Sequence, residues 1–294
     1  MEVRKLEGVT RRGKKVGHGG DISKCIACYA CFVACKDEFW NNDYLPYSLG
    51  IKKREQTLIR LERRERGKFP YVKVAYMPIM CMQCDDPPCM KVARNNAVYK
   101  REDGIVIIDP IRAAGQREIV KACPYDAVSW NDEKNIPQKC TFCVHRLELG
   151  KLPRCVQACP SGALLFGDLN DPESEVSKIV RSGLAEPFHP EYGTKPSIYY
   201  IDLYKMTKLF IAGSVAFKDT DECAEGVEVT LTDEESGESK KAKTDAFGTF
   251  EFDGLEPNRV YHIKLEYPGY ASKEILLKLD KDTYLGYLFL EREQ

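Results

Sequence analysis

Cysteines are the residues of this chain whose types and spacing could do chemistry. Twelve of its thirteen cysteines fall into four groups, which are Cys25, Cys28, Cys31 and Cys35; Cys81, Cys84 and Cys89; Cys123; and Cys140, Cys143, Cys155 and Cys159. The first group has the C-x2-C-x2-C-x3-C spacing of bacterial ferredoxins, in which the fourth thiolate ligates the neighbouring cluster. This spacing predicts 4Fe-4S cubane clusters held by cysteine thiolates.

The same crossover rule divides the twelve cysteines into three complete sets of ligands. Set one is Cys25, Cys28, Cys31 and Cys159; set two is Cys35, Cys140, Cys143 and Cys155; set three is Cys81, Cys84, Cys89 and Cys123. The remote ligands Cys123 and Cys159 are both followed by proline, as the last cysteine of the ferredoxin motif is. Cys223 is left over, and we expect it to be a small buried or loop residue.

Three other uses of the cysteines fit the pattern less well than clusters do. Structural zinc needs tetrahedral groups of four ligands, and zinc does not explain why three cysteines converge in each ferredoxin-type loop. Disulfide frameworks belong to short secreted chains with an even number of cysteines, whereas this chain has 294 residues and an odd number. Catalytic C-x2-C redox pairs explain single groups but not all four together.

Composition and charge set the broad class of protein. The chain is 43% apolar and 30% charged with a formal net charge of −1, which gives no indication of a nucleic-acid partner. Apolar runs such as residues 209–215 are too short to span a bilayer. Arg11 and Arg12 are not followed by the apolar stretch of an export signal. We therefore expect a cytoplasmic location, with export alongside a signal-bearing partner as the alternative.

The chain changes character near residue 207. Residues 1–207 contain every expected cluster ligand, and two β-hairpins are expected between the cluster loops, over residues 97–109 and 127–140. Short helices are expected over residues 111–122 and 173–182, since Pro110 and Pro172 stand at plausible helix starts. The predicted fold of this domain is a tandem ferredoxin-like arrangement, so the whole chain is of the α+β class.

Residues 208–294 alternate between polar and apolar side chains in short stretches that turns separate. This period of two predicts an antiparallel β-sandwich of about seven strands. Residues 244–250, Thr-Asp-Ala-Phe-Gly-Thr-Phe, resemble the signature of transthyretin-like and carboxypeptidase-regulatory-like domains of immunoglobulin-like architecture. That resemblance implies a scaffold or a partner contact and no catalytic residues.

The cluster domain resembles the electron-transfer subunits of the dimethyl sulfoxide reductase family. Besides the cysteines, residues 162–172 and 193–196 look like segments that follow the last cysteine group in those subunits. The resemblance implies a large catalytic partner subunit with a molybdenum or tungsten bis-pterin cofactor, and no catalytic residue in this chain. The family pattern has four clusters, but Ala93, Ala113, Gln116 and Ile119 stand where one cluster would have its cysteines. Three clusters are therefore expected.

Within that family, a three-cluster chain with an added β-sandwich resembles the small subunits of transhydroxylases that act on polyhydroxylated aromatics. Subunits of resorcinol hydroxylases and catechol dehydroxylases are the alternatives, as is a free polyferredoxin that serves several reductases. The resemblance implies a non-catalytic, electron-transfer role in a heterodimeric enzyme of anaerobic metabolism.

The remaining polar residues give weaker indications. His145 lies between two expected ligands, and we expect a partner contact or a hydrogen-bonded histidine, with tuning of a cluster as the alternative. Charges alternate in sign over residues 60–68, which is typical of a solvated face, with contact to a large subunit as the alternative.

Overall fold

The computed structural model describes residues 13–293 and separates into two compact units. Among these residues, the first unit comprises residues 13–63 and 76–203, and the second comprises residues 64–75 and 204–293. The predicted division at residues 207 and 208 stays a prediction, and the inclusion of residues 64–75 in the second unit was not foreseen. Arg11 and Arg12 lie outside the described residues. No helix within residues 13–293 has the length and apolar character needed to span a membrane.

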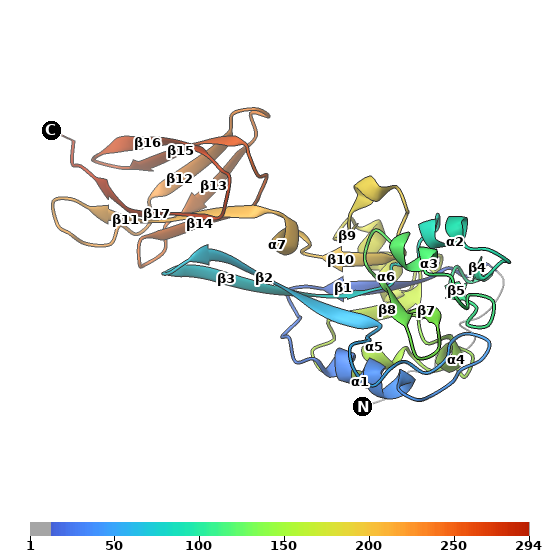
Figure 1. Cartoon of the computed structure of the whole chain (residues 1–294). Helices are drawn as coiled ribbons and strands as arrows, with labels where there is room; N and C mark the ends of the chain where they lie inside the picture. Colours follow the sequence, from blue (N-terminus) through green and yellow to red (C-terminus); the bar gives the residue numbers. More distant parts are fainter. Residues whose placement is uncertain (1–12, 294) are drawn as a thin grey trace. The chain divides into compact units, whose positions relative to one another are not determined.

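The first unit is built from short elements joined by loops (Figure 1). Its strands are β1 (Val16–Asp21), β4 (Val98–Lys100), β5 (Val106–Ile108), β6 (Val128–Asn131), β7 (Ile136–Lys139), β8 (Leu164–Asp168), β9 (Ala185–Pro187) and β10 (Ile198–Ile201). Its helices are α1 (Ala30–Phe39), α2 (Pro88–Val92), α3 (Glu118–Lys121), α4 (Val144–Leu147), α5 (Arg154–Ala158), α6 (Glu175–Arg181) and the 3-10 turn η1 (Pro190–Tyr192). Strands β2 (Ile59–Lys68) and β3 (Tyr71–Met80) form a hairpin shared with the second unit.

A four-stranded sheet in the order β8-β1-β10-β9 brings distant parts of the first unit together. β1 pairs with β8 antiparallel and with β10 parallel, and all six residues of β1 are buried. The register pairs Gly20 with Leu164. Since β1 ends shortly before Cys25 and β8 begins shortly after Cys159, this pairing holds the two cysteines at the same end of the sheet.

The two predicted hairpins are confirmed. β4 pairs with β5 antiparallel, Val98 opposite Ile108, and Gly104 supplies the positive φ of +84° in the turn. β6 pairs with β7 in the same way, Val128 opposite Lys139. The hairpins separate the loop after Cys89 from Cys123, and Cys123 from Cys140.

One predicted helix is confirmed and the other is shorter than expected. α6 occupies Glu175–Arg181, within the predicted range, with Val176 and Ser177 buried. Of residues 111–122, α3 covers four, because the chain turns before it. The Asp109 carboxylate accepts hydrogen bonds from the N–H groups of residues 111 and 112, and Gly115 takes a left-handed φ of +76° that an α-helix cannot continue through.

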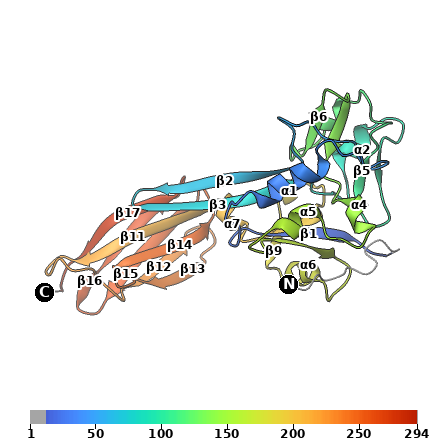
Figure 2. The same cartoon turned by 90° about the horizontal axis from the view of Figure 1, so that it is seen from below.

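The second unit is a β-sandwich preceded by a single helical turn, α7 (Tyr204–Thr207). Its strands are β11 (Leu209–Phe217), β12 (Glu228–Asp233), β13 (Ser239–Lys243), β14 (Thr249–Leu255), β15 (Val260–Tyr267), β16 (Tyr270–Lys278) and β17 (Thr283–Leu290). One sheet has the order β14-β11-β17 and the other β13-β12-β15-β16, whose strands lie side by side in Figure 2. The predicted seven strands are present between residues 209 and 290.

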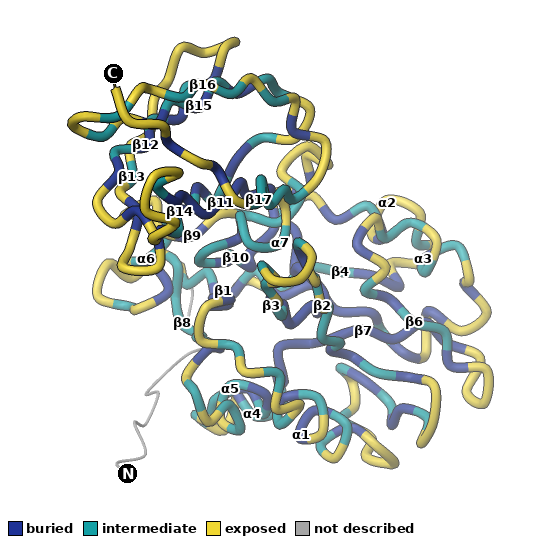
Figure 3. The backbone as a smooth tube through the Cα atoms, turned by 90° about the vertical axis from the view of Figure 1, so that its left-hand side faces the viewer, coloured by how far each residue is buried: buried dark blue, intermediate teal, exposed yellow. Residues whose placement is uncertain are grey.

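The core of the sandwich follows the predicted alternation. Buried and half-buried residues alternate along β12 and β15, so that Val229, Leu231 and Ile263 point inward. β11 differs because nearly all its residues are buried, as Figure 3 shows in dark blue. The prediction of an antiparallel sandwich is wrong for one pair, since β11 and β17 run parallel. A parallel pair needs a long connection, and β12 to β16 supply it.

The tip of the β2–β3 hairpin folds with the sandwich, and it corrects the prediction of a solvated face at one residue. Arg66 is 3% exposed, and its Nη1 and Nη2 donate to the two carboxylate oxygens of Asp253 at 2.9 and 2.8 Å. Lys73 donates to Asp253 Oδ2 at 3.0 Å. Arg63, Glu65 and Lys68 of the same run are exposed, so the predicted solvated face holds for them and fails at Arg66.

Replacing Asp253 by alanine is expected to lower the free energy of unfolding of the second unit by about 3 kcal/mol, because Arg66 would keep its charge in a buried site with its nearest remaining carboxylate, that of Asp282, 3.9 Å away. Burial works against ionisation of Asp253, yet hydrogen bonds from Arg66 and Lys73 bring its pKa from 3.8 to about 2. A carboxyl group whose pKa is lower in the folded than in the unfolded chain stabilises the fold at pH values above its unfolded pKa. The contribution of Asp253 to the free energy of unfolding should therefore disappear as the pH falls from about 4 to about 2.

Hydrogen exchange of the β14 and β11 amides during denaturant titration measures this effect within the second unit. Asp280→Ala, at an exposed carboxylate of the same unit, is the matched control and should change the free energy by less than about 0.5 kcal/mol. Equal destabilisation by the two substitutions would contradict the role given to Asp253.

Candidate metal centres

The cysteine loops contain residues in the left-handed conformation, which is rare for residues other than glycine. Ala27 and Tyr29 have φ of 54° and 58°, Gln83 has 49°, and Phe142 and Cys143 both have 52°. Successive N–H groups in such turns form concavities that bind anions, and many iron-sulfur sites use them. The N–H groups of Phe142 and Ala127 each lie 3.4 Å from a sulfur, that of Cys140 and Cys123 respectively.

Two packed helices bring the first and last cysteine groups together. In α1, Cys31 and Cys35 are one turn apart on the buried face. Cys155 lies in α5 and Cys159 follows at its end, and α5 packs against α1. Each helix therefore offers one cysteine to set one and one to set two, so the two sets are neighbours.

Set one lies nearest to solvent. Cys28 is exposed, Cys25 and Cys159 are half-buried, and Cys31 is buried. Burial raises the pKa of Cys31 to about 11, and the charges of Cys159, Cys25 and Cys28 add to the rise. The structure thus brings together the four cysteines that the sequence places in set one.

Set two is enclosed, since all four of its cysteines are buried. Burial raises the pKa of Cys35 well above its ordinary value, and Cys143, Cys140 and Cys155 raise it further. Burial likewise raises the pKa of Cys143 to about 12. These thiols therefore lie near Cys35, as does Cys31 of set one, and their assignment to one cluster stays a prediction.

Set three lines an apolar cavity. Its walls are Cys81, Cys84, Cys89 and Cys123 with Met82, Pro87, Pro88, Val106, Pro124, Tyr125 and Val128. Burial raises the pKa of Cys84 to about 12, Cys81 raises it further, and a hydrogen bond with Thr194 opposes the rise. The Thr194 hydroxyl also meets the Tyr125 hydroxyl at 2.6 Å.

The donor sets fit iron-sulfur clusters chemically. Buried thiols with raised pKa values stay protonated at neutral pH unless a nearby cationic group stabilises the thiolates, and a metal core does so. N–H groups aimed at sulfur supply the hydrogen bonds that cluster ligands accept. Within residues 13–293, no three His, Cys, Asp or Glu side chains are close enough to hold a single metal ion. The assignment of ligands to clusters stays a prediction.

The four positions that lack the family's cysteines lie around one packed region. Ala113 and Ile119 are fully buried in an apolar core that includes Cys89, and Ala93 packs against it. Gln116 Oε1 accepts a hydrogen bond from the Arg94 N–H at 2.8 Å. This region therefore holds apolar side chains and an amide in place of thiolates.

Sequence reasoning missed His18, which is buried in β1 beside set two. Its Nε2 is 3.9 Å from Cys155 Sγ, and its Nδ1 donates to the Gly19 carbonyl at 3.3 Å. Burial lowers the pKa of His18 to about 4, although the Gly19 carbonyl opposes this, so the ring is neutral at pH 7. Nothing near it in sequence indicated this contact, because the β1–β8 and β1–β10 pairings create it.

Two weaker predictions have clear outcomes. His145 is the hydrogen-bonded histidine that was expected, since its Nε2 lies 2.9 Å from Glu38 and its ring stacks on Tyr44 at 3.6 Å. Burial lowers the pKa of His145 and Glu38 opposes the fall. Cys223 was expected to be a small buried residue or a loop residue. It is an exposed residue in the segment before β12, so the loop alternative is confirmed.

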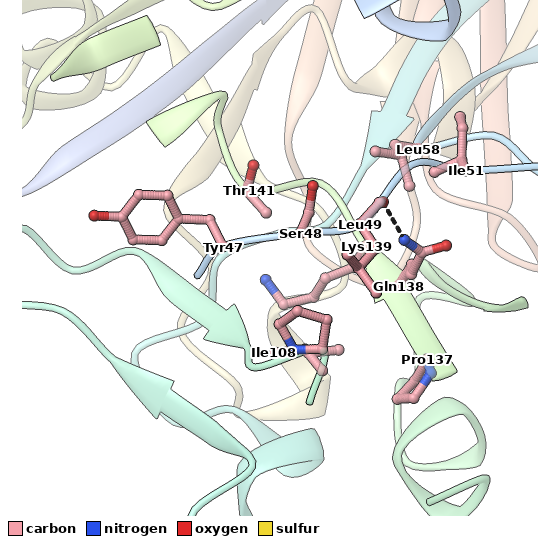
Figure 4. Close-up of a pocket in the computed structure, with 11 residues that line it drawn as sticks. Tyr47, Ser48, Leu49, Ile51, Leu58, Ile108, Pro137, Gln138, Lys139 and Thr141 are labelled. Atoms are coloured by element: carbon pink, nitrogen blue, oxygen red, sulfur yellow. Dashed lines mark hydrogen bonds between the residues drawn. The ribbon is translucent and has the colours of Figure 1, made fainter. Parts of the chain in front are cut away.

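A second, polar pocket lies between the β6–β7 hairpin and the loop after α1 (Figure 4). It is lined by Tyr47, Ser48, Leu49, Ile51, Leu58, Ile108, Pro110, Pro137, Gln138, Lys139 and Thr141. The buried hydroxyls of Ser48 and Thr141 have no hydrogen-bond partner among residues 13–293. Hydroxyls of this kind are where proteins hold internal water.

Comparisons with known proteins agree with both units. Residues 72–169 match the 4Fe-4S dicluster domain family, and residues 211–285 match the carboxypeptidase regulatory-like domain family. The first match agrees with the cysteine motifs and defines the class, a protein with a 4Fe-4S domain. Among solved structures, Klebsiella pneumoniae 5-hydroxyisourate hydrolase aligns over 30% of this chain and 95% of its own, at 20% identity and a TM-score of 0.25. A score this low supports no conclusion.

Curated relatives specify the family. The pyrogallol hydroxytransferase small subunit of Pelobacter acidigallici is 38% identical over 92% of this chain and 97% of its own length. A tetrathionate reductase subunit of Salmonella typhimurium is 37% identical over 62% of this chain and 70% of its own. The arsenate respiratory reductase iron-sulfur subunit of Shewanella is 32% identical over 62% of this chain and 93% of its own length. The chain belongs to the family of small iron-sulfur electron-transfer subunits of molybdopterin enzymes.

Replacing Cys123 by alanine should remove one cluster and leave the others. Three sets of four ligands predict about twelve iron atoms and twelve labile sulfides per chain, and about eight of each without Cys123. Cys223→Ala is the matched control and should keep all twelve, since Cys223 is exposed in the second unit. Iron analysis of the purified proteins decides, and unchanged iron in the Cys123 variant would contradict set three.

Proposed function

We propose that this chain is the electron-transfer small subunit of a heterodimeric molybdopterin enzyme acting on polyhydroxylated aromatics, with pyrogallol–phloroglucinol transhydroxylation as its reaction. One observation carries the proposal. Similarity to the Pelobacter acidigallici subunit covers 92% of this chain and so extends through the β-sandwich, whereas the tetrathionate and arsenate reductase subunits match 62%. The partner would hold the molybdenum or tungsten bis-pterin cofactor and the substrate.

We infer three 4Fe-4S clusters in a tandem ferredoxin-like domain, with the ligand sets one, two and three defined above. Support comes from the convergence of each set and from the apolar side chains at Ala113 and Ile119, which leave a fourth cube without thiolates. Contacts between neighbouring sets indicate their order along the chain of clusters. Cys31 of set one raises the pKa of Cys35 in set two, and Cys81 of set three raises that of Cys140 in set two. Set two therefore lies between sets one and three.

Thiolate-ligated 4Fe-4S clusters take up and release one electron at a time. The residues of this chain would hold the clusters, exclude water from set two, and donate backbone N–H groups to sulfur. No residue of this chain is assigned a catalytic role, so the substrate is bound and converted by the partner. In transhydroxylation the clusters would carry electrons to or from that partner only for activation or internal electron balancing.

The loop of set one is our candidate for the face that meets the catalytic subunit. Cys28 is exposed, and the surrounding apolar side chains of Ile26 and Val33 are 66% and 61% exposed. Apolar residues that are exposed together often mark a protein interface. A cluster beneath this surface would lie close to the contact, as electron transfer between subunits requires.

An affinity-tagged chain is expected to retain a large, pterin-containing partner when it is purified from its own cells without oxygen. Val33→Glu should lower the recovered partner at least about tenfold, since a charge would enter an apolar contact. Leu184→Glu, at a side chain 63% exposed in the same unit, should recover the partner normally. Both variants should keep their iron. A chain that is purified with its clusters but without a partner would favour a free polyferredoxin.

Fractionating the same cells tests the predicted cytoplasmic location.

Two assays of the purified complex separate the candidate reactions. Transhydroxylation moves a hydroxyl between aromatics with no net electron change, so pyrogallol should yield phloroglucinol with a tetrahydroxybenzene cosubstrate and no external donor. A catechol dehydroxylase would form its phenolic product with reduced viologen alone as the donor, and a resorcinol hydroxylase would need an oxidant. Failure with every polyphenol, together with turnover of an inorganic oxyanion, would overturn the proposed substrate class.

A further inference from the structure

Lys139 is a buried cation at the end of β7, immediately before Cys140 of set two. Its side chain is 3% exposed, and it forms no ion pair with any carboxylate of residues 13–293. Burying an ammonium group is costly unless negative charge lies nearby. By contrast, the buried Asp103 of the same unit is paired with Arg101 at 3.1 Å.

Hydrogen bonds place the Lys139 ammonium between sets two and three. Its Nζ donates to the carbonyl of Val106, a residue that lines the set-three cavity, and to the carbonyl of Cys140 at 3.2 Å. Gln83, which lies between Cys81 and Cys84, joins the same two residues. Its Nε2 donates to the Cys140 carbonyl at 2.7 Å, and its Oε1 accepts from the Val106 N–H at 2.8 Å.

The charge of Lys139 reaches thiols of both sets. Burial raises the pKa of Cys140 to about 12 and that of Cys89 to about 11, and Lys139 opposes the rise at each. Burial also raises the pKa of Cys123, again with Lys139 opposing. Cys140 belongs to set two, whereas Cys89 and Cys123 belong to set three.

The other side of Lys139 offers no negative charge. The polar pocket that it lines contains the hydroxyls of Tyr47, Ser48 and Thr141 and no acidic residue (Figure 4). Neutral hydroxyls solvate an ammonium group but do not neutralise it. The negative charge that balances Lys139 must therefore come from the thiolates.

We propose that Lys139 is a shared internal counter-ion, which sets the reduction potentials of the clusters in sets two and three together. The proposal rests on the proposed function, because it needs both clusters to be present. Four thiolates around a core of charge about +2 leave about −2 on each set, so the cation would lie between two negative sites. Lys139 is thus a positioning residue for charge and touches no substrate.

The sign of the effect follows from charge. Reduction adds one electron to a cluster, and a cation close by in a low-dielectric interior stabilises the reduced form. Removing the Lys139 charge should therefore move the potentials of sets two and three to more negative values. Set one should keep its potential, because the hydrogen bonds of Lys139 place its ammonium group beside Cys140 of set two and Val106 of the set-three cavity.

The test is an EPR-monitored redox titration of the full, cluster-loaded chain. Lys139→Met removes the charge at similar length, Lys139→Arg keeps it, and Lys121→Met removes the same charge from an exposed site two residues before Cys123. The signals are assigned with the Cys123→Ala variant, which lacks set three. Iron content is measured on every sample.

We expect Lys139→Met to shift two of the three midpoints negative while Lys139→Arg and Lys121→Met leave all three near wild type. Unchanged midpoints in a fully loaded Lys139→Met protein, or an equal shift from Lys121→Met, would overturn the proposal. Failure of Lys139→Met to hold clusters two and three is a separate outcome. In that case, retention of both clusters by Lys139→Arg supports the role of the Lys139 charge, and loss of both clusters from both variants overturns the proposal. Wild-type protein without three clusters would instead refute the proposed function.

Discussion

The cost of burying thiolates inside the first unit is the constraint on which the rest of the structure depends. The twelve thiols of the three predicted sets lie in this unit, and burial raises the pKa values of most of them. Protein groups offset part of that cost: backbone N–H groups lie close to sulfur, the Thr194 hydroxyl forms a hydrogen bond with Cys84, and the charges of Arg146 and Lys139 lie near Cys143 and Cys140. Only a cationic core within each set makes the arrangement stable with its sulfurs ionised.

The secondary structure serves this convergence more than it forms a core of its own. Pairing of β1 with β8 holds the two ends of set one together, and the packing of α1 on α5 lets each helix give cysteines to two sets. Short hairpins carry the chain from one loop to the next. The second unit is stabilised by the apolar core of its sandwich. The ion pair of Arg66 with Asp253 fixes the hairpin tip to this sandwich.

The sequence predicted those features that depend on residues close together in the chain. The spacing of cysteines within a loop is fixed by the covalent chain, so it indicated the ferredoxin-type groups. The alternation of polar and apolar residues between turns indicated both hairpins and the seven strands. Features that depend on distant pairings were missed. The buried Arg66 looked like part of a solvated run, and neither His18 nor Lys139 carried a local signal for contact with the cysteine sets. The helix over 111–122 was overestimated, because Gly115 and the Asp109 side chain form turns that apolar spacing does not reveal.

Anomalous diffraction at the iron edge from crystals of the loaded chain tests the central claim most directly, because it locates iron without reference to spacing or resemblance. The account predicts three separate cubane-sized peaks, each enclosed by one of the sets one, two and three, with set two in the middle. A peak beside Ala93, Ala113 and Ile119, or single-ion peaks at the cysteine loops, would contradict it.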